Sequence, residues 1–397
     1  MLRLQNYIGS YEEGRLEMTS QFFCGQIRLL LKRCHLLRKH LQSLKDIPKE
    51  LNLHLNKVDS ELEKLVYDIK KLIDDPDLGV SYLLKNQINS YRRYAENVNI
   101  LETFKITLLD NFNHKDYYFY KFSKLFCHNV KYLGEPPLVS AHSLEYFWTL
   151  PTENIIYVPL CEDNFLLGIP DFVHEVGHLF YDCFENEILQ PFTKVLRSYI
   201  KQQRENLKNK AASKSYPKYF KLLEQTWLQE YIIEFSCDIF ATYLVGSAYG
   251  WSHLRLVLVS EREIYYPSFG DEGTHPADEA RMKAILLTLK QLGESEQVEK
   301  ISQQWEQFKS IIAGPPDGEY EYCYPDEILR ELAKQVISVC EKNGLIPYHK
   351  QSYSEDNLPR LMQEAWQQFH DNPTGYVDWE TQRVEKLKLL LKNDTKH

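Results

Sequence analysis

Residues 170–180 read PDFVHEVGHLF, and this stretch decides the fold that we expect. Pro170 suits the first turn of a helix, where its missing N–H costs nothing, and Asp171 favours the positive end of the helix dipole. The stretch is therefore predicted to open a helix that carries the motif H-E-x-x-H in its first turns.

On that helix, His174 and His178 lie about 40° apart around the axis and one turn apart along it, so that both imidazoles can bind a single ion. Glu175 lies about 100° round from His174, and its carboxylate can take a proton from a metal-activated water without binding the metal. The motif also arises by chance, and helical histidines often have only a structural role, so it needs independent support.

Support comes from residues 230–241, EYIIEFSCDIFA, which are apolar enough for a buried helix. Three acids, Glu230, Glu234 and Asp238, recur there at intervals of four and share one stripe. Buried carboxylates without a partner are costly, which favours a cation beside them, although salt bridges to lysine or arginine would also satisfy them. Two histidines and one carboxylate leave a fourth tetrahedral position open for water, as in hydrolytic zinc sites.

The two segments resemble those of the gluzincin metallopeptidases, in which H-E-x-x-H is followed some tens of residues later by E-x-x-x-D. The resemblance implies that one zinc ion is bound by His174, His178 and Glu234. It also implies that Glu175 is the catalytic general base and that Asp238 accepts the other ring N–H of a ligand histidine.

Two alternatives fit less well. Glu230 competes with Glu234 as the third ligand, but only Glu234 stands where the family has its glutamate. A metzincin would need glycine and histidine where this chain has Tyr181 and Phe184.

A third segment, residues 265–282, contains Thr274-His275-Pro276 followed by Arg281. It is similar to the T/S-H-P…R segment of the family that contains the heat-shock and prenyl-processing zinc peptidases. The resemblance implies a catalytic role for His275 as a donor to the oxyanion, and a role for Arg281 in binding substrate or in bracing the helix of the acids. A plain turn before a capped helix explains the same residues almost as well.

Two tyrosines of the same segment, Tyr265 and Tyr266, are further candidates for substrate binding or for stabilising the oxyanion. The chain has 27 tyrosines, so simple packing is the more ordinary explanation of this pair.

The resemblance covers roughly residues 150–290 and departs from the known branches at two points. Relatives of the heat-shock branch are commonly embedded in membranes, whereas this chain has no apolar run long enough to span one. The thermolysin-like branch has asparagine where this chain has Ile233. The substrate class is therefore not carried over from either branch.

Residues 154–158 are predicted to form an edge strand, because they are rich in β-branched and aromatic residues and Pro159 then removes a ladder donor. In gluzincins an edge strand near the metal pairs with an extended peptide. A strand that merely packs on the helix fits the pattern equally well.

The fold class that we expect is mainly α, with a zincin-like metallopeptidase core that contains a small β-sheet and is flanked by helical regions. Turn signals at residues 134–137 and 314–318 divide the chain into three regions. These are an N-terminal helical bundle (1–135), a zincin-like catalytic domain (136–313) and a C-terminal helical region (314–397). Amphipathic helices are predicted at residues 26–44, 51–73, 326–342 and 357–370.

Composition limits the kinds of partner and the cellular compartment that we expect. A formal net charge of -9 argues against a protein that covers phosphate backbones, so no nucleic-acid partner is expected. Eight scattered cysteines without a C-x-x-C pair favour reduced thiols in a cytoplasmic protein. No secretory signal and no membrane span are expected.

The sequence therefore predicts a zinc-dependent peptidase that acts on a peptide or protein substrate. The alternative is a catalytically silent metal-binding protein that works through a protein partner on its N-terminal helices. A zinc hydrolase of non-peptide amides is a third possibility.

Overall fold

The structure of the protein is a computed structural model, and the chain is mainly helical with one small sheet, as predicted. The structure describes residues 2–44, 47–78, 80, 83–143, 146–208, 216–259, 263–267, 275–314, 316, 318–352, 354 and 356–393. Within these ranges, no helix combines the length and apolar character that a membrane crossing requires. All eight cysteines are free thiols.

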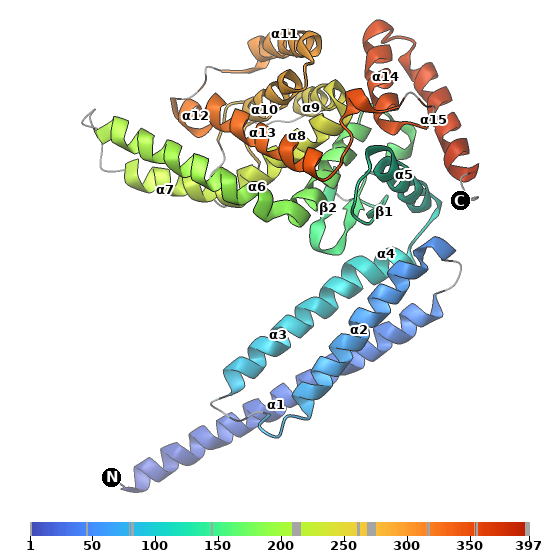
Figure 1. The fold of residues 1–397 in the computed structure, drawn as a ribbon. Helices are drawn as coiled ribbons and strands as arrows, with labels where there is room; N and C mark the ends of the chain where they lie inside the picture. The colour runs from blue at the N-terminus through green and yellow to red at the C-terminus, as the bar shows by residue number, and fades with distance from the viewer. Residues whose placement is uncertain are drawn as a thin grey trace. The chain divides into compact units, whose positions relative to one another are not determined.

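The chain forms two compact units, Met1–Asn113 and His114–His397. In the first unit, α1 (Leu2–Ser43), α2 (Asn52–Ile73) and α3 (Leu84–Ile100) run side by side in alternating directions (Figure 1). A π-helical turn and the short helix α4 (Thr107–Asp110) complete it. The helices predicted at 26–44 and 51–73 are confirmed. Their apolar residues at helical spacing are buried, among them Ile27, Leu30, Cys34 and Leu41 on α1 and Leu62, Val66 and Ile69 on α2.

The second unit begins with α5 (His114–Val130), a helix that the sequence assigned to the N-terminal region. Its side chains Phe119, Phe122 and Phe126 belong to the core cluster of the second unit. The turn signal at 134–137 corresponds to a loop between α5 and the first strand. However, α5 packs against residues that follow this loop, and it belongs to the second unit. The three-region division of the chain remains a prediction.

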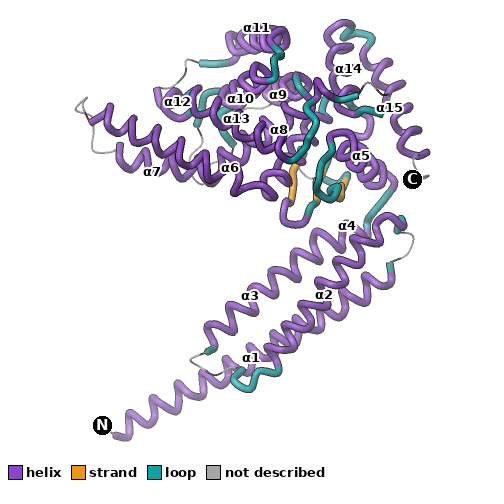
Figure 2. The backbone as a smooth tube through the Cα atoms, in the orientation of Figure 1, coloured by secondary structure: helices purple, strands orange, loops and turns teal. Residues whose placement is uncertain are grey.

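The sheet has three short strands, β1 (Leu138–Ser140), β2 (Trp148–Leu150) and β3 (Ile155–Tyr157), and Figure 2 shows how small it is beside the helices. Their order is β1-β3-β2, with β1 parallel and β2 antiparallel to β3. The expected edge strand at 154–158 is therefore wrong, because β3 is central. Pro159 lies beyond the last paired residue and removes no ladder bond, so its presence did not mark an edge.

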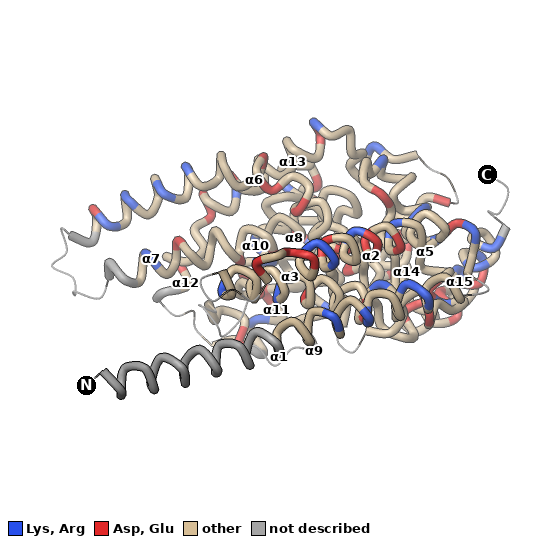
Figure 3. Tube along the Cα trace, turned by 90° about the horizontal axis from the view of Figure 1, so that it is seen from below, with Lys and Arg blue, Asp and Glu red and all other residues tan. Residues whose placement is uncertain are grey.

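The centre of the second unit is α8 (Ile232–Val245), in which every residue except Ile233 is buried. The helix α6 (Ile169–Lys208) lies against α8 (Figure 1). Acidic and basic residues alternate along the outer helices (Figure 3). The remaining helices of this unit are α7 (Tyr216–Thr226), α9 (Ser247–Val259), α10 (Asp278–Gln291), α11 (Ser295–Ile312), α12 (Gly318–Cys323), α13 (Asp326–Lys342), α14 (Leu358–Asp371) and α15 (Tyr376–Asn393).

A glycine sets how closely α6 and α8 approach. A Cβ at Gly177 would stand 2.9 Å from Cys237 Cα and 3.3 Å from Cys237 O, both backbone atoms that cannot rotate away. The two helix backbones therefore meet at a spacing that a side chain at this position would prevent. This contact lies inside the H-E-x-x-H segment.

The C-terminal helices are part of the same core. Gln351 Nε2 donates to Leu244 O at 3.1 Å and Gln363 Nε2 donates to Val245 O, so both side chains bond to the last carbonyls of α8. Gly246 then ends α8 with a positive φ of 58°, a backbone conformation that favours glycine. The helices predicted at 326–342 and 357–370 are confirmed as α13 and α14.

Candidate metal centre

The start of α6 is anchored by a buried acid. Asp171 in its first turn accepts hydrogen bonds from Tyr146 Oη at 2.7 Å and Ser252 Oγ at 2.8 Å, and Arg255 lies 3.3 Å away. Burial raises the pKa of the Asp171 carboxyl, although Arg255 opposes the rise. Besides its favourable position at the positive end of the helix dipole, Asp171 connects the start of α6 to α9 and to the loop before β2.

The two histidines of the motif face the first acid of α8. His174 Nε2 is 3.5 Å from Glu234 Oε2, and His178 Nε2 is 3.7 Å from Glu234 Oε1. A tetrahedral zinc ion with bonds of about 2.0–2.1 Å holds neighbouring donor atoms roughly 3.3 Å apart. Each histidine nitrogen thus stands a few tenths of an ångström beyond that spacing from its nearest printed Glu234 oxygen.

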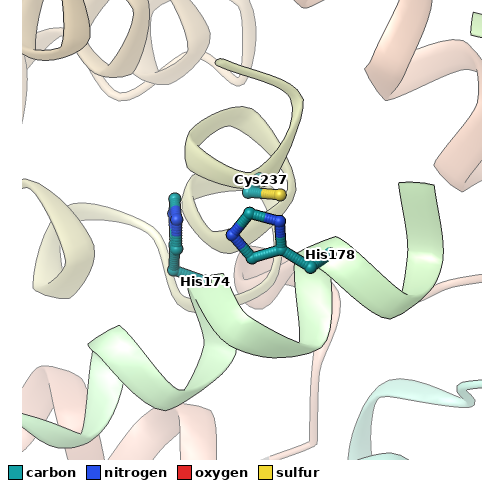
Figure 4. A group of neighbouring side chains, drawn as sticks. All are labelled: His174, His178 and Cys237. Carbon is teal, nitrogen blue, oxygen red and sulfur yellow. The ribbon is translucent and has the colours of Figure 1, made fainter. Parts of the chain in front are cut away.

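A second set of donors shares the two histidines. Atoms of His174, His178 and Cys237 lie within 4.8 Å of one another, and Figure 4 shows the thiol beside the imidazoles. This group could hold a metal ion. Burial and the acid Glu234 raise the pKa of the Cys237 thiol well above its usual value. Because a thiol binds metal as thiolate, the carboxylate is the better-prepared third donor.

The Glu234 carboxylate is buried, and its Oε2 makes no hydrogen bond. Burial alone would raise its pKa, but the imidazoles of His174 and His275 outweigh burial and bring the pKa below the usual range. A buried, ionised carboxylate whose oxygen faces imidazole nitrogens is the environment that a divalent cation would complete.

The other candidate acid lies elsewhere. Glu230 belongs to the π-helical turn Trp227–Tyr231 that precedes α8, and it is only half-buried. Burial and the neighbouring Glu234 raise the pKa of its carboxyl. Of the two acids, Glu234 is the one whose oxygens reach both histidines of α6.

The carboxylate of Glu175 is oriented by the sheet. Thr149 Oγ1, on β2, lies 2.7 Å from Glu175 Oε2 and 3.2 Å from the backbone oxygen of Glu175. Glu175 is 7% exposed. The sequence offered no signal for Thr149, because the contact depends on where a three-residue strand packs against α6.

Asp238 lies one turn beyond Glu234 and is fully buried. Its Oδ1 is 3.0 Å from His174 Nδ1, and Arg281 donates to it through Nε at 2.9 Å and Nη2 at 2.6 Å. Burial would raise the pKa of Asp238, but Arg281 and His174 hold it well below the usual range. The carboxylate therefore stays ionised and can accept the Nδ1–H of His174, which leaves Nε2 for a metal.

Arg281 and His275 flank these acids at the start of α10. The Arg281 guanidinium is bound to Asp238, so its contacts match the bracing role rather than substrate binding. His275 Nε2 is 3.6 Å from Glu234 Oε2, and its side chain is 40% exposed. Thr274, the first residue of the T-H-P match, lies outside the described residues.

Tyr265 and Tyr266, which were predicted as possible substrate contacts, differ in their surroundings. Tyr265 packs edge-on against Tyr320 with ring centroids 5.2 Å apart, and Lys309 Nζ lies over its ring at 5.8 Å. These are packing contacts. Tyr266 is 51% exposed.

The side chains around Glu234 differ in their exposure. The side chains of His174 and Glu234 are 9% and 8% exposed, whereas that of His178 is 19% exposed. His178 and His275 are thus the more exposed histidines around Glu234.

Comparisons with protein family models, with curated proteins and with solved structures found no match. The chemistry of the site therefore rests on its own residues.

Proposed function

We propose that this chain is a zinc-dependent peptidase with a zincin-like core, in which His174, His178 and Glu234 hold the ion. The observation that carries the proposal is the meeting of Glu234 with both histidines, at 3.5 and 3.7 Å, from a separate helix. Three protein donors leave one position for water, and the exposed side of His178 provides the approach.

A zinc ion held by these residues supplies a Lewis acid that polarises a carbonyl and lowers the pKa of a nearby water. Glu175, held by Thr149, takes the proton of that water and passes it to the leaving amine. His275 stands beside Glu234 on the exposed side, where its ring can donate to the developing oxyanion.

The substrate in this proposal is a peptide or protein in extended form. Within the described chain, β2 is an outer strand of the sheet and pairs with β3. Thr149 of β2 contacts the proposed base, so a peptide that pairs with this edge would pass close to the site.

Metal content tests the ligand set. Purified protein is expected to bind one zinc ion, Glu234→Gln is expected to lose it, and Cys237→Ser is expected to retain it. Glu230→Gln is the matched control, because it removes the other acid of the same stripe. Zinc lost from Cys237→Ser and kept by Glu234→Gln would mean that the thiol is the third ligand.

Turnover tests the reaction. A peptide-library digestion with zinc-loaded protein is expected to yield cleavage products, and Glu175→Gln is expected to keep zinc and lose cleavage. Equal cleavage by Glu175→Gln and the parent protein would refute the role of Glu175. Zinc binding without any cleavage would instead favour the silent metal-binding protein.

A further inference from the structure

Tyr249, on α9, makes contacts to the metal centre that the sequence did not suggest. Its hydroxyl oxygen lies 2.9 Å from His174 Nδ1, donates to Asp238 Oδ1 and accepts from Arg281 Nη2 at 3.2 Å. All four side chains are buried. We propose that Tyr249 is a positioning residue of the metal centre, which fixes the tautomer and the ring orientation of His174. The inference rests on the proposed metal-binding role of His174.

The positions of the protons follow from the partners. The phenol has one proton, and the carboxylate of Asp238 can only accept, so the tyrosine proton lies toward Asp238. Arg281 can only donate, so it occupies a lone pair of the phenol oxygen. The remaining lone pair faces His174 Nδ1.

His174 Nδ1 therefore faces two acceptors, Asp238 Oδ1 at 3.0 Å and the Tyr249 oxygen at 2.9 Å. Only a protonated Nδ1 satisfies both. In the opposite neutral tautomer, lone pairs would face each other in a buried site. The arrangement leaves Nε2 without a proton in the neutral ring, and Nε2 is the nitrogen that faces Glu234.

Tyr249 also holds the plane of the imidazole. Its ring is nearly parallel to that of His174, at 13° and with centroids 5.9 Å apart. The turn at Gly246 brings the phenol there, because α9 starts directly after it and Tyr249 N donates to Gly246 O at 3.2 Å. Because α9 follows the end of α8 directly, Tyr249 contacts His174 on the same nitrogen as Asp238 does.

The test compares Tyr249→Phe with Tyr243→Phe. Tyr243 is an equally buried tyrosine on α8 whose hydroxyl donates to Leu345 O at 3.0 Å, away from the donors. Zinc affinity is measured by competition with a chromophoric chelator. We expect Tyr249→Phe to bind zinc about tenfold more weakly and Tyr243→Phe to bind it unchanged. A loss of about tenfold is at the low end for residues that support a metal ligand, because Asp238 still accepts from His174 in the variant. Equal affinities in the two variants would overturn the proposal.

A second measurement needs no variant. Nitrogen-15 NMR of histidine-labelled, zinc-loaded protein is expected to show His174 with a proton on Nδ1 that exchanges slowly with water. Zinc on Nδ1, with the proton on Nε2, would overturn the proposal even if Tyr249→Phe failed to fold. Parent protein that binds no zinc would instead refute the proposed function, so the two failures are distinguishable.

Discussion

Gly177→Ala tests whether the spacing of α6 and α8 creates the metal centre. The added methyl group would stand 2.9 Å from Cys237 Cα and 3.0 Å from Cys237 Cβ, whereas ordinary contacts begin at 3.4 Å. Since backbone atoms cannot rotate away, the two helices must separate by about 0.5 Å at this point.

The separation acts directly on the donors. His178 follows Gly177 in the chain and Glu234 lies one turn before Cys237, so the 3.7 Å between their donor atoms would grow to about 4 Å. A bound zinc ion needs roughly 3.3 Å, and catalytic or binding groups tolerate only about 0.5 Å of misplacement. We expect zinc affinity to fall about tenfold or more, which corresponds to roughly 1.4 kcal/mol or more.

The effect on folding is expected to be smaller. Overpacking costs about 1–3 kcal/mol, but replacing glycine by alanine within a helix returns about 1 kcal/mol. The metal-free variant should therefore lose only about 0–2 kcal/mol of unfolding free energy, measured by urea denaturation in the presence of a chelator.

Gly250→Ala on α9 is the matched control. Its methyl group would meet Ile301 Cδ1 at 2.9 Å, the end of a flexible side chain that can move. Chelator competition and zinc-dependent thermal shifts are measured on both variants. If Gly177→Ala binds zinc as tightly as Gly250→Ala and the parent protein, helix spacing does not control the site.

Three further changes test neighbouring features. Thr149→Val removes the hydroxyl at Glu175 while keeping the shape, and should reduce kcat about tenfold with zinc content unchanged; a normal kcat would mean that the hydroxyl does not orient the base. Burial raises the pKa of Glu162 from 4.5 to about 7, so the folded protein retains a proton that the unfolded chain releases, and stability should fall as pH rises from about 4.5 to 7 and then stay level. At pH 8 this loss of unfolding free energy is on the order of 3 kcal/mol, and Glu162→Gln should remove it. If Glu162→Gln changes the unfolding free energy equally at pH 4 and pH 8, the raised pKa of Glu162 is contradicted. Arg281→Met leaves Asp238 buried without its guanidinium, and should lower the melting temperature and zinc affinity together; unchanged melting would contradict the bracing role.

Much of the candidate site could be predicted from local spacing. The faces of α6 and α8 follow from residues four apart on a helix, which is geometry that depends only on neighbours in the chain. For this reason His174 and His178 share a face of α6, and Glu234 and Asp238 share a face of α8. That the two faces meet was expected from the gluzincin resemblance and does not follow from spacing.

Features that depend on tertiary contacts could not be predicted. The strand at 155–157 has the composition of an edge strand, but strand order is decided by which segments pair. Both strands that precede it, β1 and β2, pair with it, one on each side. Thr149 and Tyr249 reach the motif only through packing, and neither residue type has a spacing that would reveal it.

The last carbonyls of α8 bond to Gln351 and Gln363, which follow them by 107 and 118 positions. During synthesis, the helix that carries Glu234 leaves the ribosome long before these partners exist. A chain stopped before residue 351 would therefore leave these two carbonyls without the side chains that bond to them in the full protein.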